Sequence, residues 1–205
     1  PEPTGPRLLN RPWLHGLVLT LATFVAYGAS LEGGLVWDDD RVIGAAASLP
    51  RAAAAFTTDL FGTGRGPGAV YYRPLTTLSY WVDVHLFQAA PHVGMHAVNL
   101  VWHAIASVLA LRALRRWLGH DQPLSGAVAL AAALLWAITP QKAENVAWIT
   151  GRGDVLGVVF ALTGLELAAR ATTARARMAT AAAATLLAVL CKEALVAVPA
   201  LFLGA

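Results

Sequence analysis

Three consecutive carboxylates, Asp38, Asp39 and Asp40, are the strongest candidates for chemistry in this sequence. They follow an apolar run over residues 13–31, close to the ~20 residues that a membrane-spanning helix needs. A carboxylate at the edge of a membrane can act as a general base on a hydroxyl group. Adjacent carboxylates can also hold a divalent cation, which prefers oxygen ligands. A solvated acidic loop is the simpler alternative.

Three further polar clusters lie between apolar runs, and each contains a cation. Arginine can bind a phosphate through two parallel hydrogen bonds, so Arg73 and Arg152 are predicted to hold the phosphate of a lipid-linked donor. The donor's lipid tail would lie in the bilayer, and a carboxylate would remove the acceptor's proton while the phosphate leaves. The candidate donor-binding and substrate-binding residues are Arg73, Tyr72, His96, Glu144, Arg152, Asp154, Lys192 and Glu193.

A polar stripe occurs on an otherwise apolar segment: His92, His96, Asn99, His103 and Ser107. Steps of three and four residues place these side chains on one face of a helix. In a membrane helix such a face points to the protein interior or to a water-filled cavity. Hydrogen bonding between helices explains the stripe equally well, and two histidines alone do not make a metal site. The one cofactor left open is a divalent cation at Asp38 and Asp39.

The composition is that of a polytopic membrane protein. Hydrophobic residues make up 57% of the chain and charged residues only 13%, against about 25% charged in soluble domains. The net charge of +3 does not indicate nucleic-acid binding, because the basic residues are scattered between apolar runs. A single cysteine, Cys191, excludes an intrachain disulfide.

The sequence predicts an all-α bundle of about five to six transmembrane helices. A cleaved signal peptide is the alternative for the first run, which is longer than a usual signal core. A long outer loop, 32–91, is expected to contain short surface helices, and a polar loop is expected over 140–154. Gly153 and Gly157 suit close helix packing. The chain ends within an apolar run, so we expect a fragment of a longer protein. The predicted spans lie near 13–31, 92–111, 124–139, 155–171, 174–190 and 194–205.

The basic residues predict the orientation. Lys and Arg in short segments favour the cytoplasmic side. With a cytoplasmic N-terminus, the acidic loops fall on the opposite, periplasmic or lumenal side, in a bacterial inner membrane or a eukaryotic endoplasmic reticulum. The arginines that then lie in the cytoplasm are Arg7, Arg11, Arg112, Arg115, Arg116, Arg170, Arg175 and Arg177.

Several stretches, in this order, resemble the transmembrane and tetratricopeptide-repeat O-mannosyltransferases and their bacterial relatives, which are polytopic glycosyltransferases of the GT-C class. No single stretch is specific, but the ordered set on one side of the membrane is. The matching pieces are Val36-Trp-Asp-Asp-Asp-Arg, Tyr72-Arg-Pro-Leu-Thr, Gly94-Met-His-Ala-Val-Asn with His103, Pro140-x-x-Ala-Glu, Thr150-Gly-Arg-Gly-Asp and Lys192-Glu193.

This resemblance implies an inverting transfer of a mannose-like sugar from a polyprenyl-phosphate or dolichyl-phosphate donor. The acceptor would be a hydroxyl group, such as a protein Ser or Thr or a glycan, on the periplasmic or lumenal side. Asp38 and Asp39 match the acidic pair that holds the base, and Asp40 is an additional acid. Thr139-Pro140 stands where the relatives have His-Pro, so that histidine is missing. The family's tetratricopeptide repeats are expected beyond residue 205.

A transporter or channel subunit is the competing hypothesis, with the three aspartates as an ion-entry ring. Such a protein should carry ionisable groups at mid-membrane and inverted repeats. Glu166 is the one acid well inside an apolar run, and it lies towards the predicted cytoplasmic end.

Overall fold

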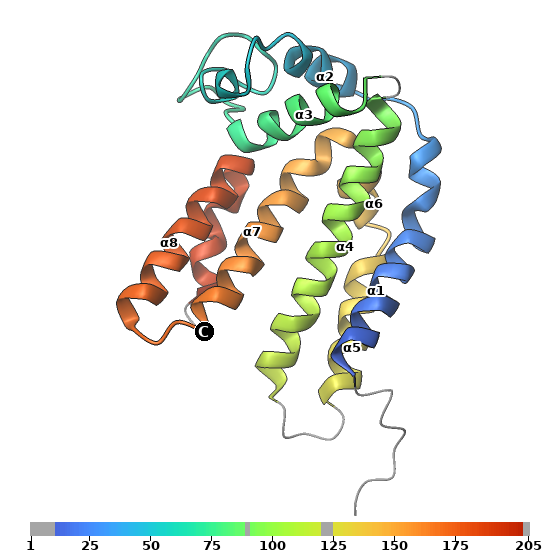
Figure 1. The fold of residues 1–205 in the computed structure, drawn as a ribbon, viewed down its shortest axis with the longest axis vertical. Coiled ribbons are helices and arrows are strands. Elements are labelled where there is room, and N and C mark those ends of the chain that lie inside the picture. Colours follow the sequence, from blue (N-terminus) through green and yellow to red (C-terminus); the bar gives the residue numbers. More distant parts are fainter. Residues whose placement is uncertain (1–10, 89–90, 120–124, 203–205) are drawn as a thin grey trace, which may run out of the picture.

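The computed structural model describes residues 11–88, 91–119 and 125–202, and this part of the chain is helical without β-strands (Figure 1). The all-α prediction is therefore confirmed. Residues 89–90, 124 and 203–205, which fall in the predicted outer loop and spans, lie outside the described residues. The long helices that run side by side are α1 (Pro12–Tyr27), α4 (Pro91–Leu118), α5 (Ser125–Ile138), α7 (Arg152–Ala168) and α8 (Ala174–Cys191).

Among the described residues, three helical segments are long and apolar enough to cross a membrane: 12–32, 92–118 and 174–191. Helix α5 and the 3₁₀ helix η4 (Glu193–Phe202) are apolar but shorter. Helix α7 has 17 residues and carries Arg152, Asp154 and Glu166, which lower its hydrophobicity. The structure thus supports a membrane helix bundle, and five to six spans remain a prediction.

Glycines allow α7 to approach its neighbours closely. A Cβ atom at Gly153 would lie 3.0 Å from the carbonyl oxygen of Cys191 on α8. A Cβ at Gly157 would lie 3.3 Å from the carbonyl oxygen of Ala188 on α8 and 2.0 Å from Leu195 Cδ1, so the Leu195 side chain would have to move. The predicted role of Gly153 and Gly157 in close helix packing is confirmed.

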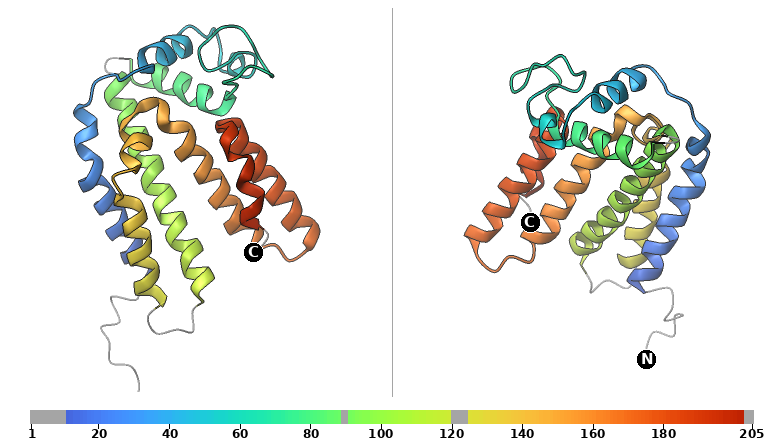
Figure 2. Two further views of the ribbon diagram at one scale, coloured as in Figure 1. Left: turned by 180° about the vertical axis from the view of Figure 1, so that it is seen from behind. Right: turned by 45° about the horizontal axis from the view of Figure 1, so that its top comes forward.

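The segment between α1 and α4 caps the upper end of the bundle in Figure 1. It begins with the 3₁₀ helix η1 (Gly28–Glu32) and continues with α2 (Asp39–Ala47), η2 (Ala52–Phe56) and α3 (Pro74–Leu86). Helix α3 lies across the ends of α4, α7 and α8, as the right-hand view of Figure 2 shows. The predicted surface helices are present, but α3 buries one of its faces and is part of the folded core.

The polar loop predicted over 140–154 is wrong. The segment forms α6 (Lys142–Ala147), the 3₁₀ helix η3 (Ile149–Gly151) and the first turn of α7. Gly151 makes this tight path possible, because a Cβ there would lie 2.6 Å from the carbonyl oxygen of Glu144. Arg152 and Asp154 therefore sit on a helix and hold fixed positions.

Arginines gather at the lower end of the bundle, at the end of α4 and around the connection from α7 to α8 (Figure 1). The buried carboxylate of Glu166 lies there and accepts hydrogen bonds from Arg112 at 3.1 Å, Arg116 at 3.3 Å and Arg170 at 3.4 Å. This carboxylate is buried and joins the end of α4 to the end of α7.

Replacing Glu166 by glutamine should destabilise the full-length protein by about 1–2 kcal/mol, because three arginines would lose their shared counter-charge. The arginine side chains are about half exposed, which limits the effect. Thermal unfolding in detergent would measure the change, with Arg175→Gln at the same end as the control. Equal melting temperatures for both variants would contradict the proposed joining role.

Candidate active site

Asp39 is fully buried and bound to the protein. Its Oδ1 accepts hydrogen bonds from the backbone N–H and the hydroxyl of Thr150, at 2.9 and 2.7 Å. Its Oδ2 accepts from the backbone N–H of Val36 at 2.9 Å. These contacts tie the acidic loop to η3, across 111 positions of sequence. The geometry therefore favours a structural role for Asp39 over the expected role of catalytic base.

Asp38 and Asp40 differ from Asp39 in their surroundings. Asp40 is exposed on the first turn of α2, where a carboxylate is favoured by the helix dipole. Asp38 precedes this helix and is half-buried, and its side chain makes no capping hydrogen bond. Its Oδ1 has no hydrogen-bond partner among the described residues. Of the three acids, Asp38 is the one that is positioned by the fold and still has an uncommitted buried oxygen.

Arg152 occupies the centre of the packed upper end and is fully buried. Its guanidinium pairs with Asp83 at 2.5 Å and donates to Asn99 Oδ1 at 2.5 Å and to the Met95 carbonyl at 3.0 Å. Burial raises the pKa of Asp83, while the charge of Arg152 and its hydrogen bond oppose that shift. The expected phosphate-binding role of Arg152 does not fit this geometry, because its donors already serve buried protein groups.

Arg73 and Glu193 bring two of the predicted clusters together. Arg73 Nε and Nη2 donate to the two oxygens of Glu193 at 2.8 and 2.5 Å, so the pair is bidentate. The hydrogen bond from Arg73 lowers the pKa of Glu193. The Glu193 side chain is 52% exposed and the Arg73 side chain only 10%, so this pair reaches the surface through the carboxylate of Glu193. Tyr72 instead donates its hydroxyl to the Phe56 carbonyl at 3.1 Å, which attaches the loop to η2.

Lys192 and Asp154 form a second ion pair, which is partly accessible. Lys192 Nζ lies 2.6 Å from Asp154 Oδ2, which also accepts from Asn145 Nδ2 at 2.9 Å. Both charged side chains are partly accessible, at 26% and 31%. Asp154 also lines a small cavity with Lys142 and Asn145 of α6. Glu144 is exposed on α6.

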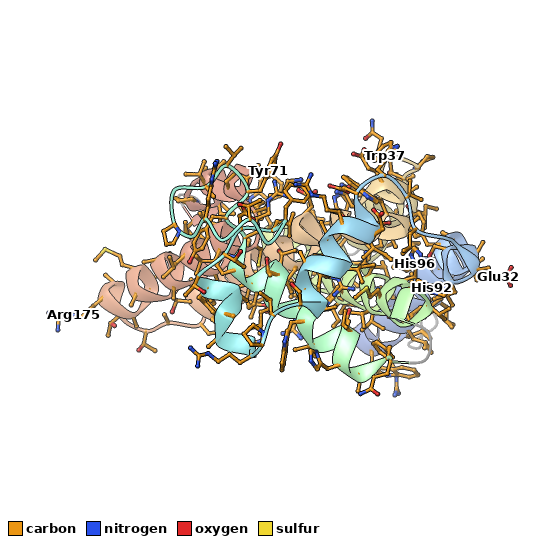
Figure 3. The ribbon with its side chains drawn as sticks, turned by 90° about the horizontal axis from the view of Figure 1, so that it is seen from above. Glu32, Trp37, Tyr71, His92, His96 and Arg175 are labelled. Atoms are coloured by element: carbon orange, nitrogen blue, oxygen red, sulfur yellow. The ribbon has the colours of Figure 1, made fainter. Side chains whose placement is uncertain are left out.

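The polar stripe of α4 faces the protein interior from His96 to Ser107, and hydrogen bonds to other elements hold two of its members, Asn99 and His103. Asn99 Nδ2 donates to the carbonyl of Trp148 at 3.2 Å, and His103 Nε2 lies 2.8 Å from the Ala137 carbonyl. His96 is buried against Gly33, in the loop before the aspartates. His92 is exposed, so the two histidines do not share one environment; Figure 3 shows both from above.

Tyr80 connects the two halves of the site. It is completely buried and donates its hydroxyl to the Ile149 carbonyl at 3.0 Å. Burial raises its pKa, and the nearby charges that act on it include Arg152, Asp39, Arg73 and Asp38. Tyr80 on α3 is thus bound to Ile149, whose neighbour Thr150 binds Asp39 of the acidic loop.

Sequence reasoning missed Asp83, Thr150 and Tyr80 as parts of this region. The spacing of Thr76, Tyr80 and Asp83 places them on one face of α3, and this pattern could have indicated that the face is buried. Thr150 belongs to a stretch that carries the family resemblance, but its contact with Asp39 could not be predicted because it depends on the path of η3.

No group of three or more potential metal ligands occurs among the described residues. Asp39 is surrounded by N–H and O–H donors, whose hydrogens point at its oxygens. These contacts satisfy the Asp39 carboxylate without a cation. A divalent cation held jointly by Asp38 and Asp39 remains a prediction.

The chain is 32% identical over 149 residues to protein O-mannosyl-transferase Tmtc2 of Drosophila melanogaster, covering 70% of this chain. It is 30% identical over 151 residues to human protein O-mannosyl-transferase TMTC1, covering 71% of this chain. A Caenorhabditis elegans protein O-mannosyl-transferase, F38B6.6, is 28% identical over 159 residues.

This chain is similar to the protein O-mannosyltransferases. The resemblance stated from the motifs is thereby confirmed. The chain spans only 15% to 22% of the length of these O-mannosyltransferases. No family model and no solved structure matches the chain.

Proposed function

We propose that this chain is part of a membrane glycosyltransferase that transfers a mannose-like sugar from a lipid-phosphate donor to an acceptor hydroxyl group, as on protein Ser or Thr. The similarity to named O-mannosyltransferases supports the transfer of mannose to protein. The observation that carries the proposal is the half-buried Asp38 with an uncommitted oxygen, at the polar end of an apolar helix bundle.

The reaction is a single displacement. The Asp38 carboxylate takes the proton of the acceptor hydroxyl, and the hydroxyl oxygen forms a bond to the anomeric carbon of the sugar. The bond between that carbon and the phosphate oxygen breaks, and the lipid phosphate leaves with the bonding electron pair. Attack opposite to the leaving group inverts the anomeric configuration, so the donor and product should differ in configuration.

Arg73 and Lys192 are the cations best placed for the leaving phosphate. Each is paired with a carboxylate that is accessible from outside, Glu193 or Asp154. A phosphate is anionic, as these carboxylates are. It can therefore replace a carboxylate in the ion pair with Arg73 or Lys192. Arg152 instead forms a buried ion pair with Asp83 and stabilises the fold around the site.

The membrane orientation in this proposal follows from charge. The lower end carries arginines at the end of α4 and around the connection from α7 to α8, and the positive-inside rule places it in the cytoplasm. The acidic upper end would then face the periplasm or the lumen, where the acceptor arrives.

The test is sugar transfer by the full-length protein in membranes. Radiolabelled mannosyl-phospho-polyprenol and radiolabelled GDP-mannose should be supplied separately, with Ser/Thr-containing peptides as acceptors. We expect label on peptide from the lipid donor, released by alkaline β-elimination. Transfer from the nucleotide sugar alone, in membranes free of lipid-linked sugar, would overturn the donor class. Absence of transfer from either donor, together with ion flux in vesicles, would support the transporter hypothesis.

A further inference from the structure

Trp37 adopts a backbone conformation that bulky residues rarely adopt. Its φ is 54°, and it is the one non-glycine residue with positive φ in the described part of the chain. A left-handed conformation is uncommon outside glycine, asparagine and aspartate, and it costs on the order of 1–2 kcal/mol for other residues. A large aromatic residue held in this way marks a position where the side chain has a use.

The local geometry explains where the strain arises. The backbone N–H of Asp39 donates to the Val36 carbonyl at 3.1 Å, which closes a turn with Trp37 and Asp38 at its centre. Asp38 has φ −99° and ψ 7°. Positive φ at the first central residue followed by this conformation is the pattern of a type II′ turn, which usually has glycine at that first position. Trp37 thus occupies a position that glycine would fill without strain.

The fold holds this turn firmly while exposing the Trp37 ring. Asp39 ties the turn to Thr150 and to the Val36 N–H. Even so, the Trp37 side chain is 78% exposed, and Figure 3 shows it at the edge of the upper surface. Burial of apolar surface therefore does not explain why tryptophan stands here.

Trp37 has an aromatic neighbour. Its ring meets the ring of Trp148 edge-on, with centroids 5.1 Å apart and planes at 79°. Trp148 is held in place through its carbonyl, which accepts from Asn99. The Trp148 indole N–H is buried without a hydrogen-bond partner among the described residues, as is Asp38 Oδ1. Two rings and two uncommitted polar atoms therefore surround one turn.

We propose that Trp37, supported by Trp148, is a platform on which a pyranose ring stacks next to Asp38. The C–H bonds on one face of a sugar carry partial positive charge and pack against the electron-rich face of an indole ring. This places a sugar beside the proposed base and makes Trp37 a positioning residue. The inference rests on the proposed function, because it assigns the sugar-binding part of the same site.

The experiment measures transfer by the full-length protein with four substitutions at one position. Trp37→Gly removes the ring and suits the positive φ, so it should fold at least as stably as the wild type. Trp37→Phe keeps an aromatic face, and Trp37→Leu keeps apolar surface without one. Trp37→Ala completes the series. Trp117→Leu, at an 83% exposed tryptophan on the last turn of α4, is the matched control.

We expect Trp37→Gly, Trp37→Ala and Trp37→Leu to raise KM by about tenfold, Trp37→Phe to remain near the wild type, and Trp117→Leu to have no effect. A rise in KM for the lipid-linked donor would show that the donor's sugar stacks. A rise for a mannosylated acceptor, but not for a plain peptide, would show that an acceptor sugar does.

Unchanged KM values in Trp37→Gly would overturn the platform. Equal activity of Trp37→Leu and Trp37→Phe would also overturn it, because Trp37 would then act as an apolar anchor in the membrane interface. If the wild type transfers no sugar, the proposed function fails instead, so the two failures are distinguishable.

Discussion

Replacing Asp38 by asparagine is expected to lower the rate of sugar transfer by about 10²–10⁴-fold, because an amide cannot accept the acceptor's proton. The variant should stay folded, since the Asp38 side chain makes no capping hydrogen bond and its Oδ1 has no partner among the described residues. Turnover of the full-length protein with a lipid-linked donor measures the effect, and thermal unfolding checks the fold.

The neighbouring acids provide matched controls for Asp38. Asp40→Asn should retain activity, because Asp40 is exposed and its stability effect should stay within ~0.5 kcal/mol. Asp39→Asn should lower the melting temperature, because an amide cannot accept hydrogen bonds from both Thr150 and Val36 as the carboxylate does. Full activity in Asp38→Asn would exclude Asp38 as the base. Loss of activity in Asp40→Asn without unfolding would move the base to Asp40.

Replacing Arg152 by methionine should destabilise the full-length protein by about 3–5 kcal/mol, because Asp83 would be left as a buried carboxylate without a counter-charge. Burial already raises the Asp83 pKa, so this carboxyl should become protonated more readily in the variant. Chemical or thermal unfolding in detergent gives the magnitude.

The double variant Arg152→Met/Asp83→Leu separates the ion pair from other roles of Arg152. Removing both charges should recover much of the lost stability, because no uncompensated charge remains. Arg51→Met, at an exposed arginine before η2, should leave stability unchanged. If Arg152→Met were as stable as the wild type but had a raised KM for the lipid-linked donor, Arg152 would bind the phosphate as the sequence predicted.

Two helices could be predicted closely from apolar runs alone, whereas α4 continues to Leu118, beyond the predicted end at residue 111. The run over 174–190 became α8, Ala174–Cys191, and the run over 124–139 became α5, Ser125–Ile138. Apolar length determines such segments, since a backbone in a membrane must satisfy its hydrogen bonds within the helix. The segment 140–154 was missed because its helices are short and depend on Gly151 and on contacts with α4.

The members of the site were predicted better than their roles. Polar residues gathered at one end because apolar helices exclude them from the middle, and this grouping follows from composition along the chain. Composition does not determine which charged side chains pair with each other. Arg73 pairs with Glu193 over 120 positions, and Arg152 finds Asp83 on a helix that lies across the bundle.

The sequence by itself determined that this is an α-helical membrane protein with acidic and basic clusters at one end, similar to O-mannosyltransferases. Only the tertiary structure distinguished the three aspartates, because burial and hydrogen bonds commit Asp39 to Thr150 while Asp38 keeps an uncommitted oxygen. It also shows that Arg152 is buried and paired with Asp83, which favours a structural role over phosphate binding. The physical reason is that the amino-acid types alone specify which side chains are charged. The solvent exposure of these side chains and their hydrogen-bond partners depend on how distant segments pack.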